Sequence, residues 1–566
     1  MSLFVLLARH FFGRFFDNDI VSQTTDMRTN AVQAFGLAAS PGIFLAFYML
    51  PTGVSYDHPF AGGWLLVIDY YLFVLYSMLM MGLLMVLEWD APFPDRKDYL
   101  VLTPLPLASR SVFAAKAVAL VVFLAAFTAG TNLFGTLLAP LVGTGGASAV
   151  SVWKVAAAHA MAVLAAGGFV ALAIAALQGI LMNVLTGHAF RRVSPWVQMA
   201  AMVLIVLVLF TTPMIWMLLR SLIEGRSAAA RWFPPFWFLG LYVDLLPGHP
   251  GGPVFHELAV RALRSVEIAA AIFAVTYLAG YRRHARRVME SIESGFDGPG
   301  RLRRAFDRLV NRWLLPHPLE RASFHFISNT ILRNARQRLF LAVYAGVAVA
   351  VALPALVWVR SHPAPDRSLV EFTPAGLLTL PLALSFFAIT GLRAAFNFPA
   401  ELRANWIFQM AESEDRAAHI RAVRKWVIVM ALAPLTAALA PFEIWMRGWR
   451  LATIHLTFAL ALALVLLHLL LVWFRKIPFT CSYFPGKTSM AVVTLIYIAG
   501  FVSYVLWMGK LEARLIDAPA GLAIYYALSI LALAGLERLE QRELSIDDVL
   551  IYEDQPDPVV RSLELG

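Results

Sequence analysis

Residues 490–509 read MAVVTLIYIAGFVSYVLWMG, an apolar run with no charged side chain, placed between Lys487 and Lys510. A helix of about 20 residues is long enough to cross the roughly 30 Å hydrocarbon core of a bilayer. The run therefore predicts a membrane-spanning helix, and runs of similar length and composition recur along most of the chain.

The residues just before this run, YFPGKTS at 483–489, resemble the end of a phosphate-binding loop. That loop needs a glycine five positions before its second glycine, so that backbone N–H groups can surround the phosphates. Cys481 occupies this position, and a membrane span follows where a soluble helix is required. The sequence therefore excludes a phosphate-binding loop here, and we expect the chain not to be an enzyme.

The composition indicates an all-α polytopic membrane protein. Of 566 residues, 60% are hydrophobic and 14% are charged, whereas a soluble domain carries about 25% charged residues. Hydropathy predicts about twelve spans, and roughly three times as many Lys and Arg residues lie on the side of the termini as on the other. By the positive-inside rule both termini are expected in the cytoplasm. The predicted spans are 31–50, 64–87, 112–142, 153–184, 197–219, 263–281, 339–359, 374–396, 426–446, 451–474, 489–508 and 518–536.

The order of these spans suggests two six-helix halves related by duplication. We expect a first half at 1–281, a basic cytoplasmic connection at 282–338, a second half at 339–536 and an acidic cytoplasmic tail at 537–566. The arginine-rich connection favours contact with anionic membrane lipids over nucleic acid.

Each half has an elaborate connection between two of its spans. The first, EWDAPFPDRKDYLVLTPLPLASRSVFAAK at 88–116, resembles the corresponding loop of ABC-2 type permeases, the membrane subunits of type V ABC exporters. PAELRANWIF at 399–408 and KIPFTCSYFPGK at 476–487 also look like segments of large two-halved bacterial permeases of this kind. The second connection, 396–426, departs from the LPLP pattern of the first.

This resemblance implies a complete transmembrane domain in a bacterial inner membrane, with two copies of a separate ATPase subunit as partners. The chain itself would hold no cofactor, and ATP-Mg would bind to the partner. The family's coupling loops would correspond to Asp95, Arg96, Asp98, Arg110, Glu401, Arg403, Trp406 and Arg416, with Lys487 as a further ATPase contact.

An aromatic connection of about 40 residues between the fifth and sixth predicted spans includes Trp232, Phe236 and Trp237. It predicts short helices at the outer interface, either as a substrate gate or as an aromatic belt. FHEL at 255–258 lacks the second histidine of a zinc signature, because Val260 stands at its position, so no metal site is expected.

Strongly polar or ionisable residues inside the predicted spans are sparse and include Asp69, Asn132, His159, Gln178, Asn183, Arg393, His455 and His468. His159 and His468 are interpreted as hydrogen-bonded packing residues. The scarcity of deep carboxylates argues against ion-coupled transport and favours an ATP-driven exporter with a lipidic or amphiphilic substrate. The alternatives are an ATP-independent carrier or lipid scramblase, and a non-transporting membrane scaffold.

Overall fold

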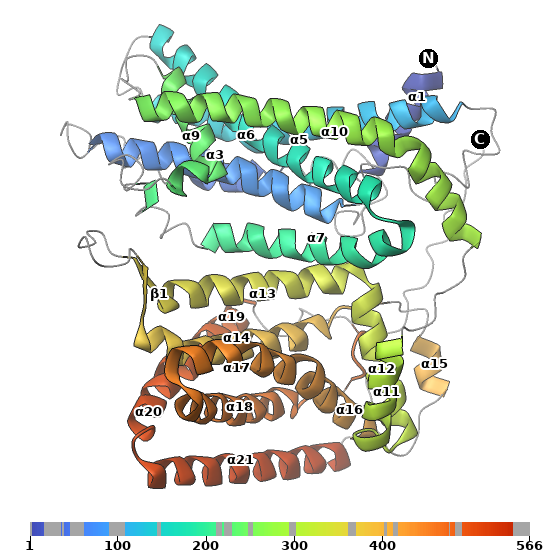
Figure 1. Cartoon of the computed structure of the whole chain (residues 1–566), viewed down its shortest axis with the longest axis vertical. Helices are drawn as coiled ribbons and strands as arrows, with labels where there is room; N and C mark the ends of the chain where they lie inside the picture. The colour runs from blue at the N-terminus through green and yellow to red at the C-terminus, as the bar shows by residue number, and fades with distance from the viewer. Residues whose placement is uncertain are drawn as a thin grey trace. The chain divides into compact units, whose positions relative to one another are not determined.

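The computed structural model is helical almost throughout (Figure 1). It describes residues 3–15, 36, 39–45, 62–89, 108–143, 149–210, 218–219, 229–246, 253–293, 301–359, 370–400, 405–410, 417–474, 476–481 and 490–546. Within these ranges ten helices are long and apolar enough to cross a membrane. The prediction of an all-α polytopic membrane protein is confirmed, whereas the count of twelve is not.

Two of the twelve predicted spans are absent from these ten. The first, 31–50, lies mostly outside the described residues. The sixth, 263–281, lies within a much longer helix, α10 (Pro253–Glu293), which is not among the ten. The structure continues α21 (Pro519–Ile546) beyond residue 536, so the predicted acidic tail starts as a helix.

Contacts between Cα atoms divide the chain into two compact units. Unit 1 comprises Met1–Ile205 and Thr212–Asp297, and unit 2 comprises Val206–Thr211 and Gly298–Gly566. The predicted domain boundaries differ in detail from these units and stay predictions.

Unit 1 is built around α6 (Ala149–Val184), which packs against α3, α5, α9 and α10. Its other elements are α1 (Leu3–Arg14), α3 (Gly62–Leu87), α5 (Ser109–Gly143), α7 (Gly187–Phe210, grouped with unit 2 from Val206 onward), η1 (Ala229–Trp232) and α9 (Pro234–Leu245). Asn132 donates to the Ser77 hydroxyl at 2.9 Å, and Ser77 donates to the carbonyl of Val163 at 2.7 Å. These buried hydrogen bonds join α5, α3 and α6 where the lipid offers no competing partner.

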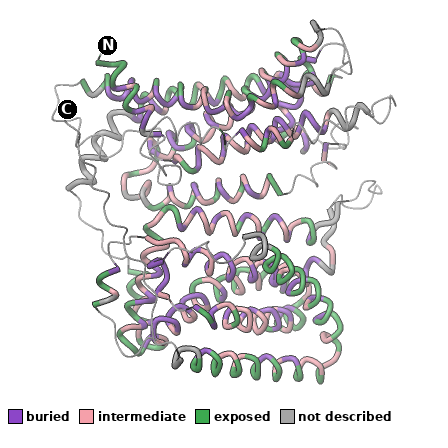
Figure 2. The backbone as a smooth tube through the Cα atoms, turned by 180° about the vertical axis from the view of Figure 1, so that it is seen from behind, coloured by how far each residue is buried: buried purple, intermediate pink, exposed green. Residues whose placement is uncertain are grey.

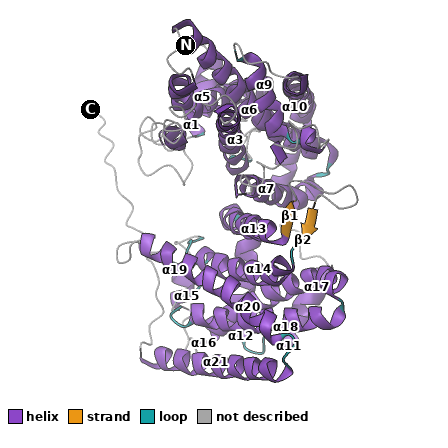
Figure 3. Cartoon of the chain, turned by 90° about the vertical axis from the view of Figure 1, so that its left-hand side faces the viewer, coloured by secondary structure: helices purple, strands orange, loops and turns teal. Residues whose placement is uncertain are grey.

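Unit 2 starts with α11 (Arg301–Trp313), α12 (Pro318–Arg333) and α13 (Ala335–Leu356). An antiparallel pair of short strands, β1 (Val357–Val359) and β2 (Val370–Phe372), leads into α14 (Pro374–Ala395) (Figure 3). Hydropathy did not predict this pair. The remaining elements are α15 (Asn405–Met410), α16 (Ala417–Val427), η3 (Ile428–Leu432), α17 (Ala433–Arg447), α18 (Trp449–Leu471), α19 (Met490–Val502), η4 (Ser503–Trp507), α20 (Met508–Leu515) and α21.

The exposed surfaces of the helices suit a hydrocarbon solvent. Figure 2 shows α21 mostly exposed along its length, and this surface includes Ile524, Leu528 and Leu531. In water such a surface would be unfavourable, but in a bilayer it contacts lipid chains at no cost.

The close crossing of α13 and α14 depends on glycine. A Cβ added at Gly376 would stand 2.1 Å from the carbonyl oxygen of Ala355 and 2.4 Å from the Cα of Leu356. These are backbone atoms, so the two helices would have to move apart to accommodate a side chain.

We therefore predict that Gly376→Ala lowers the free energy of unfolding by about 1–3 kcal/mol, because it overpacks this crossing. Gly500→Ala is the matched control, since a Cβ at Gly500 on α19 meets nothing within 4 Å. It should change stability by no more than about 1 kcal/mol, in the stabilising direction. Thermal unfolding in mild detergent measures both, and equal midpoints for the two variants would contradict the prediction.

Candidate functional site

A short helix, α15, stands between the end of α14 and the start of α16, and two contacts anchor it to the rest of unit 2. The Asn405 side chain donates a hydrogen bond of 2.7 Å to the carbonyl of Thr480. The Phe408 ring meets the ring of Phe326 on α12 edge to face, with centroids 5.0 Å apart. One contact joins α15 to the segment after α18, and the other joins it to α12, so two separate parts of unit 2 hold α15 in place.

The surface beneath α15 brings together two of the segments that carry the family resemblance. Ala400 N donates to the carbonyl of Phe479, and Phe479 N donates to the carbonyl of Phe396, each at 3.0 Å. Phe479 is buried and has a φ of +68°, an unfavourable conformation for a bulky residue. Its contacts with the Phe396 and Phe326 rings offset this strain. We call α15 with residues 396–400 and 476–481 the α15 platform.

The outer surface of α15 is apolar. Trp406 is 55% exposed, Ile407 is 50% exposed and Met410 is 75% exposed. Trp and Met are enriched in the centres of protein–protein interfaces. An anchored helix with these side chains outward has the character of a docking surface.

An ionic network behind the platform joins α12 to α16. The buried Glu320 carboxylate accepts from Arg421 Nε at 2.8 Å and from Lys425 Nζ at 2.6 Å. Lys425 also donates to the carbonyl of Leu314 at 2.8 Å. Burial raises the pKa of Glu320, but the hydrogen bonds and charges of Lys425 and Arg421 outweigh it and hold the pKa below its usual range.

Two further contacts extend this network. Trp426 Nε1 donates to the Ser328 hydroxyl on α12 at 2.8 Å. Arg424 pairs with the buried Glu540 on α21 at 2.8 Å. Residues 417–447 form one continuous helical run through α16, η3 and α17, so these contacts join α12 directly to a candidate membrane span.

Few of the predicted coupling residues can be placed. Trp406 lies on the α15 platform, and Arg110 is exposed in the first turn of α5 in unit 1. The other predicted coupling residues and Lys487 lie outside the described residues: Asp95, Arg96, Asp98, Glu401, Arg403, Arg416 and Lys487.

The three predicted outer-interface aromatics occupy different environments. Trp232 is 73% exposed, and the Arg261 guanidinium lies 5.4 Å from its ring centroid. Trp237 is half-buried and donates from Nε1 to the carbonyl of Arg231 at 2.8 Å. Phe236 is fully buried against Tyr71, so its side chain belongs to the core of unit 1.

His159 and His468, which the sequence indicated as packing residues, are hydrogen-bonded as expected. His159 Nδ1 lies 2.8 Å from the Tyr242 hydroxyl, and His468 Nδ1 lies 2.9 Å from the carbonyl of Leu464. His455 differs, because it lies between two buried carboxylates, Glu443 and Glu512. Glu443 and Glu512 lie near the ends of predicted spans, and hydropathy did not identify either as a candidate buried residue. A search for acidic residues within a turn or two of the span ends could have found them.

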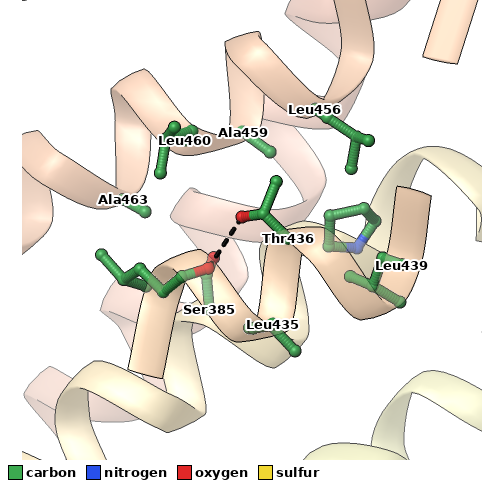
Figure 4. A pocket seen from close by; sticks show the side chains of 10 residues that line it. Ser385, Leu435, Thr436, Leu439, Leu456, Ala459, Leu460 and Ala463 are labelled. Carbon is green, nitrogen blue, oxygen red and sulfur yellow. Dashed lines mark hydrogen bonds between the residues drawn. The ribbon is translucent and has the colours of Figure 1, made fainter. Parts of the chain in front are cut away.

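Unit 2 also contains a small apolar pocket between α14, α17 and α18 (Figure 4). Ser385 and Thr436 are its polar residues, and Thr436 donates to the carbonyl of Leu432 in η3 at 2.8 Å. The other lining residues are Pro381, Leu432, Leu435, Leu439, Leu456, Ala459, Leu460 and Ala463. None of these lining residues is charged, and the pocket has room for no more than one water-sized group.

No group of three or more His, Cys, Asp and Glu side chains is arranged to hold a metal ion in the part of the chain that the structure describes. Comparisons of the chain with models of protein families, with curated proteins and with solved structures find no match.

We predict that Glu320→Gln lowers the free energy of unfolding by about 1–3 kcal/mol at neutral pH, because Arg421 and Lys425 lose their charged acceptor. With a folded-state pKa below the unfolded value of about 4.3, the contribution is present above that pH and is lost as the pH falls through the folded pKa. The deficit of the variant should therefore shrink below about pH 4.

Unfolding at several pH values tests this, with Glu267→Gln as the control, because Glu267 is exposed on α10. If the two variants have the same stability at neutral pH, the Glu320 network does not stabilise the fold.

Proposed function

We propose that this chain is the permease subunit of an ABC exporter, moving its substrate by alternating access driven by a separate ATPase. The observation that carries the proposal is the α15 platform. It presents Trp406, Ile407 and Met410 outward at the connection where the family resemblance expects the coupling loop of the second half. Two of the segments that suggested the resemblance, 399–408 and 476–487, meet in this platform.

The Glu320 network gives the proposal a route for force. In this mechanism the ATPase pushes on α15, and the push reaches α12 through the contact between Phe408 and Phe326. It then passes to α16 through Glu320, Arg421 and Lys425, and along the continuous helical run at 417–447. Packed side chains and ion pairs with two discrete arrangements are the usual carriers of such coupling.

Two ATPase subunits would bind ATP-Mg, since this chain supplies no phosphate-binding loop of its own. The second ATPase copy would contact the first connection, at Asp95, Arg96, Asp98 and Arg110. We propose a lipidic or amphiphilic substrate because the predicted spans hold few carboxylates near the middle of the bilayer. We place the protein in a bacterial inner membrane with both termini in the cytoplasm.

A second candidate is an ATP-independent carrier. The buried carboxylates Glu443 and Glu512 beside His455 favour it, because carriers coupled to protons keep such groups inside the membrane.

A pull-down from native membranes in mild detergent, followed by mass spectrometry, distinguishes the two candidates. We predict that an ABC ATPase co-purifies with the native chain and that Trp406→Ala with Met410→Ala reduces its recovery at least about tenfold, as expected for an aromatic anchor. Trp449→Ala is the matched control, since Trp449 is 74% exposed at the start of α18, away from the platform.

Loss of the ATPase from the platform variant alone, with an unchanged thermal midpoint, supports the proposal. Retention by that variant but loss on changing Arg96, Asp98 and Arg110 to Ala assigns the coupling to the first connection instead. If the native chain captures no ATPase, the exporter proposal fails and the carrier becomes the better candidate.

A further inference from the structure

Three fully buried ionisable side chains meet where α17, α18 and α20 come together in unit 2. Glu443 comes from α17, His455 from α18 and Glu512 from α20, and each is 0% exposed. They lie near the connections from α17 to α18 and from α20 to α21. Figure 1 shows α20 at the opposite end of unit 2 from α12 and α15, so this cluster is remote from the α15 platform.

The geometry orients the imidazole ring of His455. Its Nδ1 lies 2.5 Å from Glu512 Oε1, closer than in a usual N–H···O hydrogen bond, and with Glu512 ionised Nδ1–H is the donor. Its Nε2 therefore points to the other carboxylate, and Glu443 Oε1 lies 3.8 Å away. Neither this oxygen nor Nε2 has a hydrogen-bond partner among the described residues.

The charges of this cluster do not balance without an added proton. Arg447 Nε lies 3.5 Å from Glu443 Oε2 and supplies one positive charge against two carboxylates. With a neutral His455 the cluster is left with one uncompensated negative charge, which is costly in a buried site. The lone pair of Nε2 then also faces a carboxylate oxygen, so that two acceptors meet without a donor.

Among the described residues, α14, η4 and α21 offer no other charge to this cluster. On α21, Tyr525 donates its hydroxyl to the carbonyl of Phe458, and on η4 the Tyr504 hydroxyl pairs with Ser385 of α14. Tyrosine is neutral at physiological pH. The charged residue of α14 is Arg393, whose guanidinium bonds to the carbonyl of Leu470 near the other end of α18.

We propose that Glu443, His455 and Glu512 form a buried proton-binding site. Hydronium gives its proton to the site and leaves as water, and the proton is held on His455 Nε2, which faces Glu443 Oε1. The two facing acceptors then become a donor and an acceptor, and the cluster, with Arg447, becomes neutral. The bound proton links the hairpin of α17 and α18 to α20. The site is independent of any ATPase partner.

Proton release on unfolding tests this directly. In weakly buffered detergent solution at about pH 8, an unfolded chain retains no proton on its histidine or glutamate side chains. The native chain should therefore release about one more proton per molecule on unfolding than Glu443→Gln. That variant is neutral without an added proton, because Arg447 balances Glu512.

Glu512→Gln should match Glu443→Gln for the same reason, and it decides the test if Glu443→Gln does not fold. Asp517→Asn is the control, an equivalent change at an exposed carboxyl group five residues after Glu512, and it should behave as the native chain. Equal proton release from the native chain and both glutamine variants would overturn the proposal.

Discussion

A bilayer offers no water to backbone N–H and C=O groups, so each segment that crosses it must satisfy them internally. The long helices of both units follow from this constraint, and so does the apolar exterior of helices such as α21. Inside the units the same constraint gives polar side chains unusual importance. The chain of hydrogen bonds from Asn132 through Ser77 to Val163 joins three helices in a medium that offers these side chains no water.

The same medium makes every buried charge depend on its neighbours, and unit 2 handles this in two ways. Glu320 accepts hydrogen bonds from two cations and also lies at the boundary where α12 meets α16. Glu443 and Glu512 share one guanidinium and one imidazole. In the first arrangement each carboxylate oxygen of Glu320 has a cationic donor, and the contacts join α12 to α16. The second lacks one positive charge, and this deficit makes it suited to binding a proton.

The α15 platform illustrates how irregular backbone is held in a protein of this class. The segment before α15 and the segment after α18 meet there through backbone hydrogen bonds between Phe396, Ala400 and Phe479. The strained conformation of Phe479 persists because aromatic rings surround it. These contacts hold the short helix α15 in place while its Trp406 side chain stays exposed.

The sequence by itself determined the helical membrane class and ten of the candidate spans, because hydropathy is a sum over neighbouring residues and needs no tertiary information. It also identified the two segments that form the platform, although not their contact. It did not find the strand pair at Val357–Val359 and Val370–Phe372, the burial of Phe236, or the meeting of Glu443 with His455 and Glu512. Those depend on which helix faces come together. A glutamate near a span end has the same hydropathy whether it faces water or an imidazole ring, and only packing distinguishes the two.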